Sequence, residues 1–367
     1  ALPIYITGTG GGNTSSGNNY GVLLWNPVTG TGSGAVTITG TGGGGTGSNN
    51  YGISVSNAAI VKSASGGLSL SGRAGSGTNS QGIYIGGAST LGGVGQTGAV
   101  TLTSDALSLS GTNTLTTTGV VTFQPFTNGS TIGVGSGTGT LSLPASLFSG
   151  ATRLVTEGAS SIVIGSSTAG NVTVGGAVDF SDSTTLLTGG NITLNSGTAV
   201  TNSQAGGYMA LAATGNFINN AGASAVSTTD AGANDRWIVY SNTPLSNTFG
   251  SLNSANNPVW GSTFATLSPS SVAAGNRYVF ASSPSVVVST TSTNKTYGST
   301  LDTYSLVSIG GGAGSSVYTD FTLNDVFSVL PAVTSSGAVN TAVVGNYGVT
   351  ATGGTVNSGY TVSYNNV

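Results

Sequence analysis

Apolar positions recur at a fixed spacing in the first third of the chain. Four of them stand 32 residues apart, at Ile6, Ile38, Leu70 and Leu102. Mostly hydroxyl residues stand on either side, in the rows Tyr5, Thr37, Ser69, Thr101 and Thr7, Thr39, Ser71, Thr103. Because successive side chains of a strand point to opposite faces, the pattern predicts strands with an aliphatic inner face and a hydroxyl-bearing outer face.

Further short strands are expected in each block. A second strand follows a glycine-rich loop, at residues 20–25, 51–56 and 82–85, and a third is predicted at residues 59–63 and near 89–91. One block of short strands cannot bury its own apolar stripe, but stacked blocks bury it when equivalent strands pair in parallel. The repeat therefore predicts a parallel β-helix whose first coils carry an enlarged loop.

The repeat divides the chain into three parts. The period shortens after residue 105, and we expect residues 1–225 to form a β-helix of roughly eight to ten coils. Residues 226–285 lose the repeat and gain aromatic residues, which predicts an aromatic-rich cap over the last coil, followed by a linker near Ser283 and Pro284. Residues 286–367 alternate as expected for a small antiparallel β domain.

The glycine run GTGGGG at residues 40–45 superficially matches a phosphate-binding loop. A loop of that kind needs a following Lys-Ser or Lys-Thr pair and a helix that offers its N-terminal amides. Neither follows here. We therefore expect a structural loop that returns on successive coils.

Composition excludes several classes of function. The chain has 63 Gly but only six Lys and Arg, nine Asp and Glu, and neither His nor Cys. We therefore predict a protein that is not an enzyme, with no catalytic residue, no metal site and no cofactor. A net charge of −3 gives no basic footprint for nucleic acid. The apolar runs are shorter than the roughly 18 residues of a spanning helix, so no membrane span is expected.

The few acidic residues leave an enzyme alternative open, since parallel β-helices also host polysaccharide lyases and hydrolases. Asp179 and Asp182 are the nearest pair, and glycoside hydrolysis needs two carboxylates about 5–9.5 Å apart. Residues three apart in a strand point to opposite faces, so this pair meets only if a turn intervenes. The other acids are expected to bound turns or form local pairs: Asp105, Glu157, Asp230 and Asp235 beside Arg236, and Asp320 with Asp325.

Aromatic residues beside the glycine-rich loops are the candidate glycan contacts. Tyr20, Trp25, Tyr51 and Tyr84 offer flat apolar faces bordered by hydroxyl and amide groups, which suits sugar rings. A structural alternative is a ladder from Tyr20 to Tyr51 that seals the stacked loops. The rows of Thr and Ser raise a further alternative, an ice-binding face, although Arg73 interrupts the row of Thr9 and Thr41.

Several segments together resemble the exported β-helical adhesins of the filamentous haemagglutinin type. They are YGVLLW at residues 20–25, FINNAG at 217–222, DRWIVYS at 235–241 and GNRYVFASSP at 275–284. The tail, with KTYG at 295–298, GNYGV at 345–349 and GYTVSY at 359–364, resembles the MBG/YDG-type repeat domain. The resemblance implies a right-handed parallel β-helix, export by outer-membrane secretion machinery, and adhesion or biofilm matrix building at the cell surface.

The first predicted strand is also a candidate assembly edge. The end coil of a β-helix carries unpaired backbone groups, so Leu2, Ile4, Tyr5 and Ile6 are expected to accept a strand from a partner. This predicts head-to-tail assembly into filaments. The expected partners are other copies of the chain or matrix polysaccharide.

Overall fold

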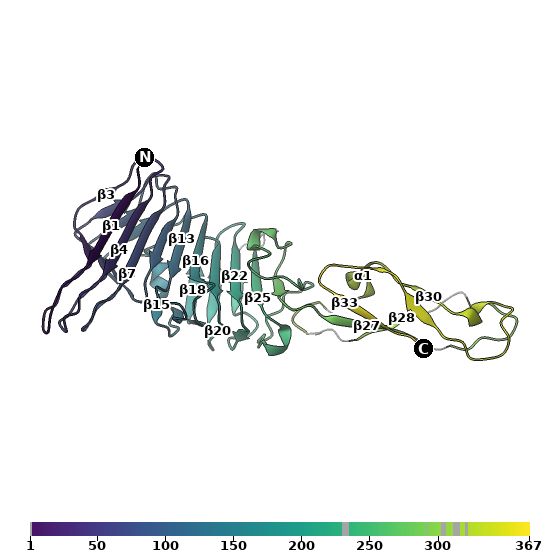
Figure 1. Ribbon diagram of the computed structural model, residues 1–367. Coiled ribbons are helices and arrows are strands. Elements are labelled where there is room, and N and C mark those ends of the chain that lie inside the picture. The colour runs from purple at the N-terminus through teal and green to yellow at the C-terminus, as the bar shows by residue number, and fades with distance from the viewer. Residues whose placement is uncertain (1, 230–234, 292, 302–305, 311–315, 320–321) are drawn as a thin grey trace.

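The computed structural model describes residues 2–229, 235–291, 293–301, 306–310, 316–319 and 322–367, which form a β-helix followed by a narrow tail (Figure 1). The main sheet has ten strands, each parallel to its neighbour. Their order is β1 (Ile4–Thr9), β4 (Val36–Thr41), β7 (Leu68–Arg73), β10 (Val100–Thr103), β13 (Val120–Gln124), β16 (Ser161–Ser166), β19 (Thr184–Thr188), β22 (Tyr208–Ala213), β25 (Arg236–Ser241) and β26 (Arg277–Phe280). The predicted parallel β-helix is confirmed.

The register of the first coils is the predicted one. Ile6 pairs with Ile38, Ile38 with Leu70, and Leu70 with Leu102. Ile38 and Leu70 are completely buried, whereas the threonines and serines that flank them are half-buried on the outer face. Val172 also pairs with Ile192, as the shorter period requires.

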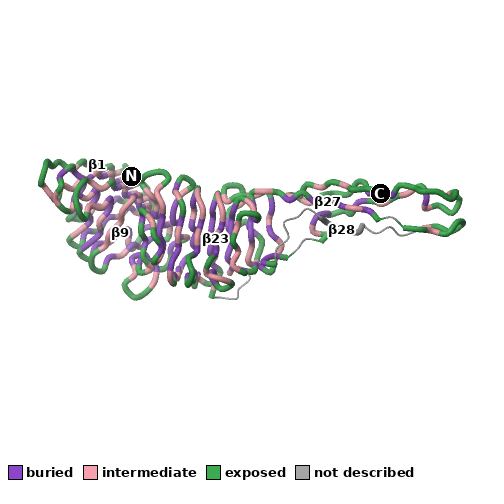
Figure 2. The backbone as a smooth tube through the Cα atoms, turned by 90° about the horizontal axis from the view of Figure 1, so that it is seen from below, coloured by how far each residue is buried: buried purple, intermediate pink, exposed green. Residues whose placement is uncertain are grey.

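Two shorter sheets complete the first four coils. The second sheet has the order β11 (Leu107–Ser110), β8 (Ile83–Gly86), β5 (Ile53–Val55) and β2 (Val22–Leu24). The third sheet has the order β12 (Thr114–Thr116), β9 (Thr90–Gly92), β6 (Ile60–Lys62) and β3 (Val28–Thr29). Figure 2 shows that buried residues run along the β-helix, whereas much of the tail is exposed.

The glycine-rich loops stack on one another and project from the first coils (Figure 1). A Cβ atom on Gly43 would lie 1.6 Å from the carbonyl oxygen of Gly11 in the preceding loop, so only glycine allows this approach. Asn50 is completely buried in this stack, where its Nδ2 donates to the carbonyls of Gly45 and Ser76, both at 2.7 Å. The glycine run is thus a structural loop, as expected.

The β-helix changes its internal arrangement after β13. β14 (Ile132–Gly135) pairs with β17 (Val172–Gly175) on one side and with β15 (Leu141–Leu143) on the other. β15 follows β14 in the sequence and contacts β11, so the chain turns back toward the N-terminal coils before it continues. The fourth sheet then runs through β20 (Ile192–Leu194) to β23 (Phe217–Asn219), and the fifth contains β18 (Ala177–Phe180), β21 (Ala199–Asn202) and β24 (Val226–Thr228).

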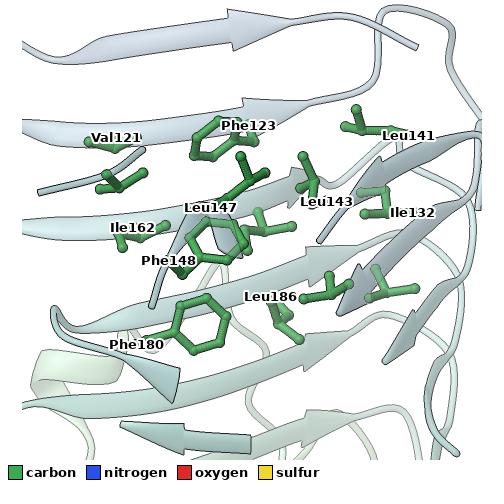
Figure 3. Packing of buried hydrophobic residues seen from close by; sticks show 14 of the residues in the cluster. Val121, Phe123, Ile132, Leu141, Leu143, Leu147, Phe148, Ile162, Phe180 and Leu186 are labelled. Atoms are coloured by element: carbon green, nitrogen blue, oxygen red, sulfur yellow. The ribbon is translucent and has the colours of Figure 1, made fainter. Parts of the chain in front are cut away.

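A short 3₁₀ helix, η1 (Ala145–Leu147), fills the interior at this change. Phe148 follows it and is 1% exposed. Its ring lies between those of Phe123, with a centroid distance of 5.7 Å, and Phe180, at 4.9 Å (Figure 3). This insertion keeps the apolar core continuous between the two halves of the β-helix.

The main sheet runs beyond the predicted end of the β-helix at residue 225, because β25 and β26 continue it. A segment at residues 262–272, which includes η3 (Pro269–Ser271), covers the outer face of these last strands; η2 (Pro244–Ser246) precedes it. Phe264 and Leu267 from this segment pack against Ala212 and Tyr240. β25 is therefore buried on both faces, which removes the alternation that marks the earlier coils.

The tail contains a small mixed sheet and two strand pairs. β27 (Ser285–Thr290) pairs antiparallel with β28 (Leu306–Gly310) and parallel with β33 (Thr361–Asn365). The antiparallel pairs are β29 (Phe327–Val329) with β32 (Thr355–Val356), and β30 (Ala332–Thr334) with β31 (Thr350–Thr352). Helix α1 (Leu323–Val326) and the 3₁₀ helix η4 (Ser336–Ala338) complete it. The tail therefore contains one parallel strand pair in addition to the expected antiparallel pairs.

The tail closes the C-terminal end of the β-helix. Tyr318 is 4% exposed, and its ring centroid lies 5.9 Å from that of Phe280 and 6.0 Å from that of Tyr278. The backbone nitrogen of Ser254 donates to the carbonyl of Val317 at 2.7 Å. The aromatic residues expected in a cap do lie at this end, but a side chain from the tail completes their packing.

Candidate functional site

Three tyrosine rings form a stack on the outer face of the second sheet. The ring centroids of Tyr20 and Tyr51 are 5.6 Å apart with an interplanar angle of 29°. Those of Tyr51 and Tyr84 are 4.8 Å apart at 12°. We call these three residues the tyrosine ladder.

The backbone explains how the ladder forms. Tyr20 and Tyr51 occupy equivalent positions in successive coils. The hydrogen bond from the nitrogen of Gly21 to the carbonyl of Tyr51, at 2.9 Å, shows this alignment. Tyr84 comes from a different position, within β8, where it pairs with Ser54. Ser54 lies between Leu23 and Tyr84 in the register and is only 3% exposed, as expected if the neighbouring rings cover it.

Two asparagines with a left-handed backbone conformation accept hydrogen bonds from the hydroxyl groups of two of these rings. Tyr51 Oη donates to Asn49 Oδ1 at 3.0 Å, and Tyr20 Oη donates to Asn18 Oδ1 at 3.2 Å. Asn18 and Asn49 have φ values of 58° and 65°, a conformation that asparagine tolerates better than most residues. Burial, with smaller effects from Tyr84 and Tyr20, raises the pKa of Tyr51. The Tyr51 hydroxyl therefore stays a hydrogen-bond donor at neutral pH.

Trp25 follows β2 and lies outside the tyrosine ladder. It is 57% exposed, and Leu23 on the same strand is 43% exposed. Residues 23 and 25 share a face by strand alternation, and Leu23 belongs to the same row as Tyr84. The structure thus stacks three of the four predicted glycan contacts, including the expected ladder from Tyr20 to Tyr51, and leaves Trp25 exposed at the end of β2.

Residues 2–61 carry no charged side chain, and Lys62 is the first one along the chain. In the next coil Arg73 is exposed, and its backbone lies against Gly52, the neighbour of Tyr51. Aromatic rings, hydroxyl groups and amides therefore make up most of the surface that the first two coils contribute. Such a surface can bind an uncharged ring that has apolar C–H faces and hydroxyl edges.

Asp179 and Asp182 do not form a catalytic pair. Asp179 lies on β18, and its Oδ2 accepts from the hydroxyl of Ser203 at 3.2 Å. Asp182 is 1% exposed, and its Oδ1 accepts from the backbone nitrogen of Gly158 at 2.9 Å. Burial raises the pKa of Asp182. A carboxyl that is closed off from solvent cannot reach a polysaccharide bond.

The remaining acidic residues that the structure describes take local roles. Asp105 accepts from the nitrogen and hydroxyl of Thr127, and Glu157 pairs with Arg153 at 2.7 Å. Asp325 caps α1 and also accepts from Asn257 Nδ2 at 2.8 Å.

Asp230 and Asp320 lie outside the described residues, and Asp235 directly precedes β25. The Nη2 group of Arg236 donates to the carbonyl of Pro269 at 2.9 Å, so this arginine holds the segment over the main sheet. Within the described part of the chain, no three Asp, Glu, His or Cys side chains gather as a metal site would require.

The outer hydroxyl rows are aligned as predicted. Thr7, Thr39, Ser71 and Thr103 are neighbours in the register, and Thr9, Thr41 and Arg73 form the next row. Arg73 is exposed and interrupts the second row. Tyr5, Thr37, Ser69 and Thr101 are also neighbours in the register, so two rows of hydroxyl groups run over four strands, and Arg73 ends the row beside them.

The predicted assembly edge lies on the end strand of the main sheet. Leu2 is 91% exposed and Tyr5 is 72% exposed, whereas Ile4 and Ile6 are partly buried against the core. The opposite end of this sheet is covered: Val259 forms a parallel bridge with Val279 of β26, and its nitrogen donates to the carbonyl of Tyr278 at 2.9 Å. The two ends of the β-helix are therefore not matching strand edges.

Sequence reasoning missed a cavity of about 340 Å³ between the main sheet and the segment at residues 262–272. It opens beside β22 and β25 and is lined by Leu187, Ala212, Tyr240, Phe264 and Ala281, among others. The run of apolar residues on both faces of β25 was the available signal.

Comparison with models of protein families, with curated proteins and with solved structures gave no match to this chain. Among the helices in the described residues, none is long and apolar enough to cross a membrane.

Proposed function

We propose that this chain is a rigid, non-enzymatic rod that acts outside the cell as an adhesin or as a subunit of a matrix fibre. The resemblance to adhesins of the filamentous haemagglutinin type, with an MBG-type tail, supports this proposal. The continuous parallel sheet supports it as well, because each coil adds about 4.8 Å of regular length. Export to the cell surface or the extracellular matrix is part of the proposal.

The observation that carries the proposal is the tyrosine ladder beside exposed Trp25 and Leu23. A sugar ring can place its C–H face on exposed Trp25, or on Tyr20 at the end of the ladder, while its hydroxyls reach Asn18, Asn49 or Ser56. Each contact of this kind is weak, but many sugars along one polysaccharide bind together through effective concentration. The rod would therefore attach to uncharged polysaccharide at many points.

A glycan array tests this function with four variants. Trp25→Ala removes an exposed aromatic face, and Tyr51→Ala removes the central ring that holds the ladder together, so both are expected to reduce binding. Tyr51→Phe keeps the ring and removes only the bond to Asn49, so it should retain most of the binding. Tyr297→Ala removes an aromatic residue that is 69% exposed in the tail and serves as the matched control. Undiminished binding by both Trp25→Ala and Tyr51→Ala would exclude Trp25 and the tyrosine ladder as the contact.

Self-association is a second proposed property, carried by the end strand β1 with its exposed Tyr5 and by exposed Leu2 just before it. Natural proteins often protect such strands with charges, and this one has none. Because Val259 and Tyr318 cover the other end of the β-helix, a head-to-tail contact has to use the tail and not β26. Imaging a variant without residues 1–7 tests this: unchanged filaments would rule out β1 as the joint.

A further inference from the structure

The cavity over the main sheet is a slot whose shape follows from the register. Leu187, Ala212 and Tyr240 are neighbours on three successive strands and point to the outer face. The alanine is small and stands between two large side chains, so it leaves a depression. Its walls come from strands about 10 Å apart, which is twice the strand spacing.

The segment at residues 262–272 forms the other side of the slot and is held in place. Tyr240 Oη donates to the carbonyl of Leu267 at 3.0 Å, and its ring meets that of Phe264 edge to face, with centroids 5.7 Å apart. Arg236 Nη2 donates to the carbonyl of Pro269 at 2.9 Å. The slot is therefore largely formed before any ligand arrives, as is usual for small-molecule sites.

The lining of the slot is apolar at its base and polar along its rim. Leu187, Ala212, Tyr240 and Phe264 provide apolar surface, whereas the rim carries hydroxyl and amide groups from Ser167, Thr214, Ser241, Asn242 and Thr263. No charged side chain lines the slot. This combination favours an uncharged ligand with an apolar body and several hydroxyl groups.

We propose that the slot binds a single pyranose ring of an uncharged polysaccharide. Its volume of about 340 Å³ lies near the lower limit for ligand sites, roughly 300 Å³, so it suits one sugar ring. Ala212 and Tyr240 at the base are 1% and 2% exposed, so the C–H face of the ring would rest against half-buried Leu187 and Phe264, and its hydroxyls would reach Thr214 and Asn242. The proposal rests on the proposed function for the class of ligand, and adds a second site well separated in sequence from the tyrosine ladder.

Hydrogen–deuterium exchange on the full chain tests the slot. The probes are cellotetraose and maltotetraose at millimolar concentration, with a tetragalacturonate as a charged comparison and hexanol as an apolar one. The neutral sugars should slow exchange of the backbone amides at residues 263–267 and 212–214. Ala281→Trp places a large ring at the exposed mouth of the slot and should weaken binding there by about tenfold or more.

Phe264→Ala removes a wall of the slot without filling it and should also weaken binding. Ala199→Trp, an exposed position on β21, is the matched control and should bind as the wild type does. Thermal unfolding of each variant shows whether it is folded. Unchanged sugar affinity in folded Ala281→Trp overturns the proposal, as does protection of residues 263–267 by hexanol alone or by no probe.

This experiment tests the two proposed sites independently, so one proposal can be overturned while the other stands. Protection at residues 18–25 that is lost in Trp25→Ala supports the site formed by Trp25 and the ladder, whatever happens at the slot. Protection at residues 263–267 that survives Trp25→Ala supports the slot, whatever happens at the ladder. Protection at residues 18–25 alone supports the proposed function and overturns the slot.

Discussion

The side-chain oxygen of Asn50 accepts two hydrogen bonds from Asn19. The backbone nitrogen of Asn19 donates at 3.0 Å, and the Nδ2 group of Asn19 donates at 2.9 Å. Asn50 Nδ2 in turn donates to carbonyls of its own loop and of the following one. Through these bonds one buried amide joins the glycine-rich loops of three successive coils. The loops lack side chains that could hold them together by packing.

Replacing Asn50 by alanine should lower the free energy of unfolding by about 3 kcal/mol, because several buried groups lose their partners at once. Asn13→Ala in an exposed part of the first loop is the control and should change it by less than about 0.5 kcal/mol. Urea-induced unfolding measures both values. Equal effects of the two substitutions would contradict the role given to Asn50.

Phe148→Ala should be among the most destabilising core substitutions. Its ring separates Phe123 from Phe180 at the change of arrangement, so the variant leaves a cavity where the two halves of the β-helix meet. Large-to-small changes of this kind cost about 3–5 kcal/mol. Phe126→Ala, at a position that is 38% exposed, is the matched control. A loss for Phe148→Ala no greater than that for the control would show that the insertion is dispensable.

Asp182 should make the protein less stable as the pH rises. Burial raises the pKa of this carboxyl in the folded state, with Glu157 adding to the shift and the backbone of Gly158 and Arg153 opposing it. The folded state then holds the proton over a range of pH in which the unfolded chain, with an ordinary value of about 3.9, has lost it. The contribution of this group to the unfolding free energy falls through that range and stays low above it.

Asp182→Asn removes this titration and keeps an oxygen that accepts from Gly158. Unfolding in urea between about pH 3 and pH 8 should show the variant gaining stability relative to the wild type as the pH rises. Two curves that run parallel over the whole range would contradict the prediction.

Tyr318→Ala should expose the aromatic end of the β-helix. Tyr318 packs against Phe280, Tyr278, Trp260 and Phe249, and these rings would face solvent without it. We expect a loss of about 3–5 kcal/mol and stronger binding of a hydrophobic dye. Tyr318→Phe keeps the ring packing and should lose far less. An unchanged dye signal in Tyr318→Ala would argue against the closure.

The register of the first coils could be predicted because short local patterns in the sequence determine it. An aliphatic residue between two polar ones recurs every 32 residues, and parallel pairing of equivalent strands follows from it. The position of Tyr84 in the ladder could not be predicted in this way. Its ring reaches Tyr51 from a backbone position three residues further along the repeat, and only side-chain direction decides that contact.

The extent of the main sheet could not be predicted from the sequence either. Ile238 and Tyr240 face outward in β25, yet they are buried because residues 262–272 fold over them. A strand that is buried on both faces loses the alternating pattern, so the sequence there resembles a cap. The contact of Tyr318 with Phe249 also joins residues far apart in the sequence, and the local pattern of neither segment predicts it.

The closure by Tyr318 has a mechanical consequence. Only residues 281–284 separate β26 from β27, and the carbonyl of Pro284 accepts from the nitrogen of Thr361 at 3.0 Å, so the linker predicted near Ser283 and Pro284 is held within the fold. A load applied between the tail and the β-helix would act on buried aromatic contacts and strand pairs in shear. The junction should therefore work as a stiff coupling, and bending of a longer assembly would have to occur elsewhere.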